Sequence, residues 1–77
     1  MAQFVVETTP EEREAILNVI KQIEGQTVPV RVIAEMADMS QSRARYALID
    51  LLEARKIERV ASKAINKHYV RYSYKLL

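Results

Sequence analysis

Apolar side chains in the first third of the chain recur every three or four residues, which predicts a helix with one buried face. The apolar stripe consists of Ile16, Val19, Ile20 and Ile23. Thr9 can cap the first turn, Pro10 suits the first helical position, and Glu12 completes a capping box with Thr9. The glycine at position 25 is typical of a helix end. The first helix is therefore predicted over residues 10–24.

The next two predicted helices are separated by a very short connection. Thr27 and Val28 precede a proline and should be extended, as a short strand before a helix over residues 30–37. Ser40 is a good cap for a third helix over residues 41–55. The buried face of that helix is predicted at Ala44, Ala47, Leu48, Leu51 and Leu52. Two helices joined by so short a turn predict a helix-turn-helix.

The pattern changes to a period of two residues near the end of the chain. Strands are predicted over residues 57–62 and 67–76, with a hairpin loop at 63–66. In the second strand, Tyr72 and Tyr74 share a face with other apolar residues, so both rings should face the core. The element order is that of a single winged helix-turn-helix domain, an α+β fold that is mainly α. Residues 1–8 are expected to form an N-terminal arm or an edge strand.

Composition narrows the functional class. The 77 residues include no cysteine and one histidine, His68, and no glycine-rich loop is present to hold a phosphate. We therefore expect no enzyme activity, metal site or cofactor. No apolar run is long enough to span a membrane, and no signal peptide is recognisable, so the expected location is the cytoplasm.

Charge is divided unevenly between the two halves of the chain. Residues 1–39 carry three Lys or Arg against seven acids, a balance of −4, whereas residues 40–77 carry nine against three, a balance of +6. A basic C-terminal half is typical of a surface that binds a polyanion, although a small soluble domain can also divide its charges this way by chance.

The start of the third predicted helix carries positive charge where the helix dipole disfavours it. Arg43 and Arg45 lie in the first two turns, while Asp50 and Glu53 come later. A recognition helix enters the major groove with its N-terminal end, where cations are useful. The candidate DNA contacts on this helix are Gln41, Ser42, Arg43, Arg45 and Tyr46. The alternative is that the arginines are ordinary solvent-exposed helix formers.

The predicted hairpin loop offers a second set of contacts. Lys63, Asn66 and Lys67 would reach flanking phosphates if the hairpin acts as a wing. Lysines also protect exposed strand edges from aggregation, which is the alternative explanation. Ile49, on the exposed side of the third helix, either packs under the wing or contacts a thymine methyl group.

The segment SQSRARYALIDLLE resembles the small winged helix regulators of fimbrial (pilus) operons in enteric bacteria. That family has an Ala-Arg-Tyr-x-Leu segment in its recognition helix, matched here by Ala44, Arg45, Tyr46 and Leu48. The resemblance extends weakly over residues 10–77. It implies control of a surface-organelle operon, with Arg45 and Tyr46 as the leading DNA contacts and Arg43 as a weaker one. The wing sequence KAINK lacks the glycine expected in the family, and the FVVE arm is additional.

Together these features predict a sequence-specific regulator that binds double-stranded DNA, with the third helix in the major groove and the wing on the backbone. One such module buries only about 600–1,000 Å², so a homodimer or a larger co-regulator on adjacent DNA is expected. The alternative is a winged helix adaptor or inhibitor, for example from a phage or plasmid, whose basic face binds an acidic protein. Winged helices serve both roles.

Overall fold

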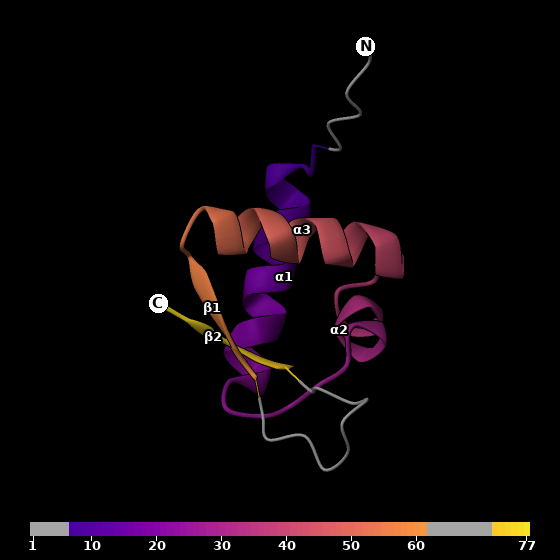
Figure 1. The fold of residues 1–77 in the computed structure, drawn as a ribbon. Coiled ribbons are helices and arrows are strands. Elements are labelled where there is room, and N and C mark those ends of the chain that lie inside the picture. Colours follow the sequence, from indigo (N-terminus) through magenta and orange to yellow (C-terminus); the bar gives the residue numbers. More distant parts are fainter. Residues whose placement is uncertain (1–6, 62–71) are drawn as a thin grey trace.

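The computed structural model of the chain describes residues 7–61 and 72–77. Three helices come first in the chain: α1 (Pro10–Ile23), α2 (Val30–Met36) and α3 (Gln41–Glu53). The strands β1 (Ile57–Ala61) and β2 (Tyr72–Leu76) follow and pair antiparallel. Figure 1 shows α3 crossing in front of α1, with α2 at one end of α3 and the two strands at the other. This is the predicted winged helix-turn-helix order, mainly α with a terminal hairpin.

Helix α1 begins with the capping box that the sequence predicted. The Thr9 hydroxyl accepts a hydrogen bond from the Glu12 backbone N–H at 3.1 Å, and the Glu12 carboxylate accepts one from the Thr9 N–H at 2.9 Å. These two bonds satisfy amides that the first turn of a helix leaves unpaired. The helix ends at Ile23, one residue before the predicted end, and Gly25 then adopts a φ of 86° that suits glycine.

Helices α2 and α3 each end before a residue in the left-handed region. Asp38 has a φ of 55° and Arg55 a φ of 57°. In both cases the next N–H bonds back to a carbonyl five residues earlier, from Met39 to Ala34 and from Lys56 to Leu51 at 3.0 Å. Helix α3 therefore stops at Glu53, before the predicted end at residue 55, because a left-handed residue cannot continue a right-handed helix.

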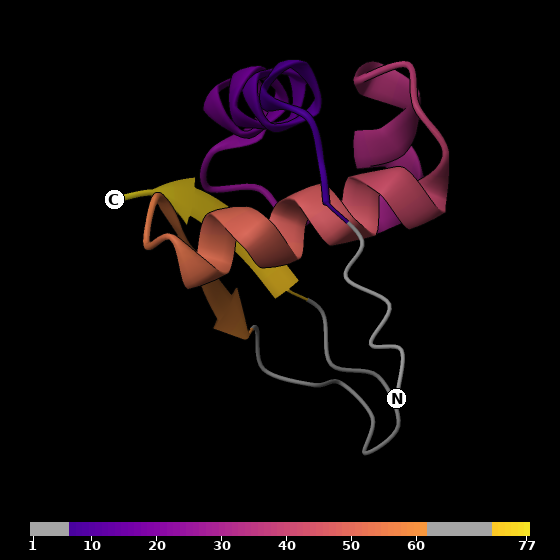
Figure 2. The same cartoon turned by 90° about the horizontal axis from the view of Figure 1, so that it is seen from above.

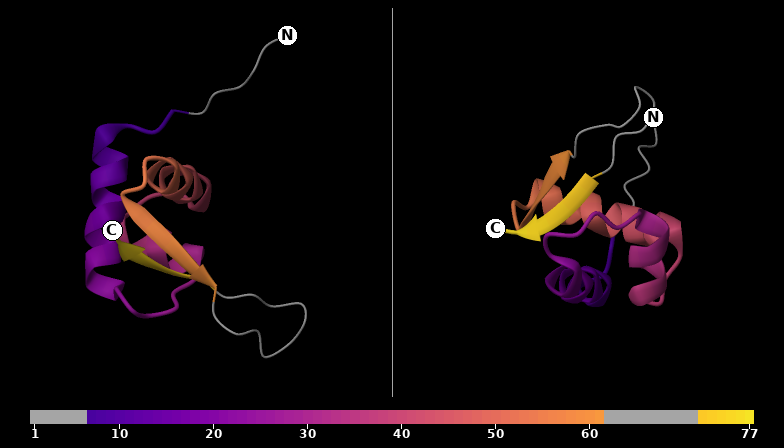
Figure 3. Two further views of the ribbon diagram at one scale, coloured as in Figure 1. Left: turned by 60° about the vertical axis from the view of Figure 1, so that its left-hand side comes forward. Right: turned by 90° about the horizontal axis from the view of Figure 1, so that it is seen from below.

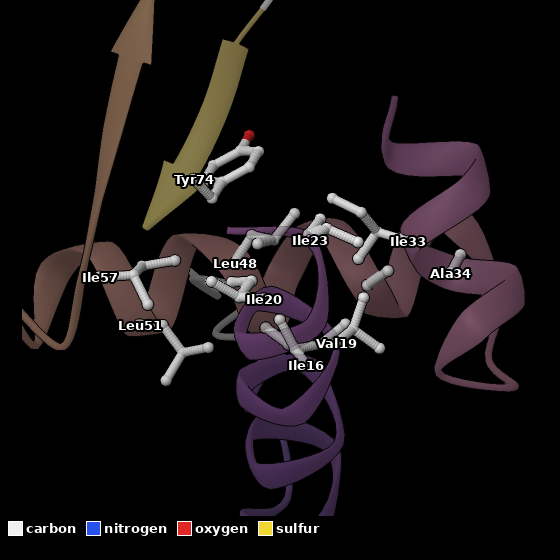
Figure 4. Packing of buried hydrophobic residues seen from close by; sticks show 12 residues of the cluster. Ile16, Val19, Ile20, Ile23, Ile33, Ala34, Leu48, Leu51, Ile57 and Tyr74 are labelled. Carbon is white, nitrogen blue, oxygen red and sulfur yellow. The ribbon is translucent and has the colours of Figure 1, made fainter. Parts of the chain in front are cut away.

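The hydrophobic core lies where the three helices and the sheet meet, and Figure 4 shows the side chains that fill it. It contains the predicted stripe of α1 and most of the predicted face of α3, with Leu52 only half-buried. The largest fully buried side chains are Ile16, Ile20, Ile33, Leu51 and Ile57. Full burial of such a side chain stabilises the fold by about 1.5–3 kcal/mol relative to exposure. The core fixes one side of α3 and leaves its opposite side outward.

The hairpin register sets which strand residues face the helices. Ile57 lies opposite Leu76 and Ala61 opposite Tyr72. A hairpin loop at 63–66 would instead place Tyr72 opposite Ile57, so the observed register differs from that prediction by four residues; residues 62–71 lie outside the described part of the chain. Tyr74 is buried at 7% exposure as predicted, whereas Tyr72, on the same face of the sheet, is 37% exposed and is not part of the core.

The extended segment before α2 joins the sheet at one point. Thr27 forms an isolated antiparallel bridge with Ser73 of β2. The predicted short strand is therefore a single bridge that ties the start of the helix-turn-helix to the hairpin. Of the residues described, no helix is both long and apolar enough to cross a membrane. The predicted arm falls mainly at positions 1–6, outside the described residues.

Candidate nucleic-acid interface

The outward side of α3 is the candidate interface, because both neighbouring helices lie behind it. Figure 2 shows α1 and α2 on the same side of α3, while β1 projects past α3 on the other side. The exposed residues of α3 are Gln41, Ser42, Arg45, Tyr46, Ile49 and Glu53. Four of the five predicted contacts on this helix are thus accessible to a ligand, and Tyr46 and Ile49 are 40% and 43% exposed. Among the described residues, Ile49 belongs neither to the buried core nor to the partly buried apolar residues packed against it.

Arg43, the fifth predicted contact, has partners inside the molecule. Its Nε donates to Glu12 Oε2 at 2.7 Å and its Nη2 donates to Glu12 Oε1 at 2.5 Å. Nη2 also donates to the backbone carbonyl of Glu7 at 3.2 Å. These hydrogen bonds from Arg43, followed by the backbone bond from Thr9, lower the pKa of Glu12 from 4.5 to about 2. The positive charge of Arg43 is therefore matched within the fold.

Asp50, at the same flank of α3, also has a partner near the start of α1. Thr8 is buried, with 6% of its surface exposed, and its hydroxyl donates to Asp50 Oδ2 at 2.5 Å. Arg13 Nη1 donates to the Thr8 hydroxyl at 3.0 Å and to the Thr8 carbonyl at 2.5 Å. Figure 2 shows residues 7–9 running from α1 onto α3.

We call these contacts the N-terminal clasp, formed by Thr8, Glu12, Arg13, Arg43 and Asp50. The clasp accounts for two of the four charges on α3 that oppose its dipole, Arg43 and Asp50, by tertiary contacts rather than by a ligand. Arg45 and Glu53 have no ion pair with another described residue. Of the two arginines that oppose the dipole of α3, only Arg45 therefore still indicates a ligand.

The other flank of α3 faces the sheet, where the structure adds a cation that sequence reasoning missed. The Arg59 guanidinium lies 4.3 Å from the centroid of the Tyr72 ring. Arg59 is exposed and lies opposite Tyr74 in the register. The signal was present in the sequence, since Arg59 comes two residues after buried Ile57 and strand residues two apart share a face.

The pKa of Tyr74 is affected by both Arg45 and Arg59. Burial raises the pKa of Tyr74, and the positive charges of Arg59 and Arg45 oppose that rise. A charge acts on a phenol mainly from nearby. Arg59, from β1, has the larger effect on Tyr74, and Arg45, from α3, has the smaller one.

The predicted wing contacts Lys63, Asn66 and Lys67 lie outside the described residues, as does His68. In the described part of the hairpin, Lys75 pairs with Glu58 at 2.7 Å, and this pair occupies the sheet face opposite Arg59. Figure 3 shows the two strands from two further sides, and the view from below shows β1 reaching past α3.

The described residues offer little for other chemistry. No three His, Cys, Asp or Glu side chains among them gather as a metal site would require. A hollow of about 210 Å³ lies between α1 and the end of α3, with Leu17, Leu51 and Ala54 among its lining residues. Its lining comes from α1 and from the C-terminal end of α3, away from the exposed residues at the start of α3.

Comparison with known proteins identifies the fold. The structure of a cysteine-to-serine mutant of Lactococcus lactis ZitR matches with a TM-score of 0.58 and 23% identity, covering 100% of this chain and 48% of that one. The crystal structure of L. lactis ZitR, described as a zinc-responsive MarR family member, matches with a TM-score of 0.58 and 21% identity, covering 100% and 49%. The chain thus spans about half the length of these proteins, and the likeness confirms the winged helix fold. No protein-family model and no curated protein matches the chain.

Proposed function

We propose that this domain binds double-stranded DNA sequence-specifically and regulates transcription, with α3 in the major groove and the hairpin on the backbone. The observation that carries the proposal is the exposed row Gln41, Ser42, Arg45 and Tyr46 on the N-terminal half of α3. A recognition helix presents this part of its surface to base edges. The structurally similar ZitR, a MarR family member, supports the assignment at the level of fold.

The residue types suit different parts of a DNA duplex. Arg45 can donate two hydrogen bonds either to guanine or to a backbone phosphate, and Gln41 can pair with adenine. Ser42 and Tyr46 are suited to phosphate oxygens, which position a protein without reading sequence. Because the outward side of α3 holds one cation and one acid, Arg45 and Glu53, most of the attraction to phosphates must come from elsewhere. Lys63, Asn66 and Lys67 of the predicted wing remain the proposed source.

Exposure divides the four residues that match the fimbrial regulators into two kinds. Of the four matching residues, Ala44 and Leu48 are 0% and 2% exposed and fill the core, as any helix at this place must. Arg45 and Tyr46 are exposed, so they form the part of the match that packing does not explain. We propose these two as the residues that read or position DNA, and control of a surface-organelle operon as the role to test first.

An NMR titration with random-sequence duplex tests the proposal. We expect amides of residues 41–46 to shift first at low salt, and the binding constant to fall steeply as salt rises, because each neutralised phosphate releases counterions. If no duplex binds at low salt, the proposal is wrong. A homodimer or a co-regulator on adjacent DNA would show as cooperative binding to a longer duplex.

The alternative function is a protein-interaction adaptor, which one observation favours. Tyr46 and Ile49 are both exposed on the outward side of α3, at 40% and 43%, and aromatic residues are enriched at protein interfaces. An acidic protein that binds this face at physiological salt, while duplex DNA does not bind at low salt, would establish the adaptor instead.

A further inference from the structure

We propose that Arg45 and Arg59 together bind one phosphate group of the DNA backbone at the junction of α3 and the hairpin, with Tyr72 holding Arg59 in position. We call this site the junction clamp. It rests on the proposed DNA-binding function and adds to it a backbone contact from the base of the hairpin rather than from its tip.

The strand register brings Arg59 to the correct side of the sheet. Along the face that meets the helices, the first cross-strand pair is Ile57 with Leu76, the next is Arg59 with Tyr74, and the third is Ala61 with Tyr72. Burial falls along this row, from Ile57 at 1% exposure to Tyr72 at 37%. Arg59 therefore lies where the sheet leaves the core, opposite Tyr74, and Tyr74 shares the core with Leu48, which is one turn along α3 from Arg45.

The contact with Tyr72 gives Arg59 a defined position. Its guanidinium carbon is 4.3 Å from the ring centroid, within the distance at which a cation is attracted to an aromatic face. The N–H groups of a guanidinium lie in its own plane. A guanidinium that lies over a ring can therefore still donate two hydrogen bonds to one phosphate. The stack reduces the side-chain freedom lost on binding.

The charges around the site favour an anion. Glu58, the acid beside Arg59 in the sequence, lies on the opposite face and pairs with Lys75 at 2.7 Å. Arg45 and Arg59 form no ion pair with a described residue. Both positive charges act on the phenol of Tyr74, Arg59 more than Arg45. A phosphate bound by both arginines would be attracted by two positive charges at once.

The position of the site indicates which phosphate it takes. Arg45 belongs both to the clamp and to the exposed row of α3, so a ligand held by the clamp is continuous with one lying against α3. A backbone phosphate of a duplex satisfies both contacts at once, whereas a free phosphate ion uses only the clamp. We therefore assign the site to nucleic acid.

Arg59→Gln is the variant that tests the clamp, and Lys21→Gln is the matched control. Lys21 is an exposed cation near the end of α1, behind α3, so both changes remove one surface charge. With random duplex we expect Arg59→Gln to weaken binding roughly tenfold, because a charge-assisted hydrogen bond is lost. It should also reduce the slope of log Kobs against log salt by about 1, which Lys21→Gln should not.

Substitutions at Tyr72 test whether its ring positions Arg59 or its hydroxyl contacts the DNA. Tyr72→Phe keeps the ring and should bind duplex like the wild type, whereas Tyr72→Leu should fall between the wild type and Arg59→Gln. Thermal unfolding of each variant shows whether the fold is retained. As a direct readout, the Nε–H signals of Arg45 and Arg59 should shift in NMR spectra when duplex is added.

The possible results of these experiments distinguish a failure of the junction clamp from a failure of the DNA-binding function. If the wild type binds duplex but Arg59→Gln behaves like Lys21→Gln, the clamp is wrong and the DNA-binding function stands. If the wild type binds no duplex at low salt, both proposals fail. If inorganic phosphate shifts the two Nε–H signals and duplex does not, the site is a free-anion site and the assignment to nucleic acid is overturned.

Discussion

The two flanks of α3 each carry an arginine near the start of the helix, but the surroundings of the two arginines differ. Arg43 and Arg45 are two positions apart, so at 100° per residue they point in nearly opposite directions, about 160° apart around the helix. Arg43 is held by Glu12 and the Glu7 carbonyl in the N-terminal clasp, whereas Arg45 is exposed beside the sheet. A charge that opposes a helix dipole therefore indicates a ligand only when no other part of the fold supplies a partner for that charge.

The largest expected effect concerns DNA binding and contrasts the two arginines directly. Arg45→Ala should cost about 1–3 kcal/mol of binding free energy with a cognate duplex, as the loss of a specific arginine contact does. Arg43→Ala should change the affinity by less than about threefold, because Arg43 is already paired, and residual effects on steering are small. Fluorescence anisotropy with labelled duplex measures both; equal losses would contradict the contrast.

The next effect concerns stability at the clasp flank. Thr8→Val keeps the side-chain shape but removes the hydroxyl that donates to Asp50 and accepts from Arg13. We expect the free energy of unfolding to fall by about 1–3 kcal/mol, since partly buried groups lose their hydrogen-bond partner. Urea unfolding measures the change.

Thr27→Val is the control for this change, because Thr27 is exposed and its bridge to Ser73 uses the backbone. It should alter the free energy of unfolding by no more than about 0.5 kcal/mol. If the two variants are equally stable, the Thr8–Asp50 contact does not hold the flank.

The smallest expected effect is a pH dependence of stability. The pKa of Glu12 is lowered from 4.5 to about 2 in the folded protein, so folding favours its ionised form. This contribution is complete above pH 4.5 and is lost as the pH falls towards 2. The stability of Glu12→Gln should therefore decline less steeply over this range than that of the wild type.

Arg43→Gln should flatten the same pH profile, because the hydrogen bond from Arg43 is the main cause of the lowered pKa. Glu14→Gln, a change at an exposed position of the same helix, serves as the charge-matched control. Urea midpoints measured across the acid range compare the variants. If Glu12→Gln and Glu14→Gln give the same slope, the ion pair does not couple the helices in solution.

The helical part of the fold could be predicted because its signals are local. The capping box at Thr9 and Glu12, the Ser40 cap and the spacing of apolar residues all operate within one or two turns. The sequence also placed Arg45 and Tyr46 on an exposed face of α3. The helix ends were less accurate, because a left-handed Arg55 has no strong local signal.

The clasp and the clamp could not be predicted, because their partners are distant in sequence. Arg43 meets Glu12 and Asp50 meets Thr8 only after α1 packs on α3. The position of Arg59 beside Tyr72 depends on the hairpin register, which a predicted loop at 63–66 would have changed. Periodicity shows which face of an element is buried, but it does not show which residue of another element lies there.

The bridge between Thr27 and Ser73 has a consequence for the order of folding during synthesis. It joins the start of the helix-turn-helix to a strand that leaves the ribosome after residues 7–61. Contacts between α2 and α3 are local and form quickly, whereas closing a chain loop from Thr27 to Ser73 is slower. Until β2 forms, the part of the core surface that Tyr74 covers in the folded protein therefore remains exposed to solvent.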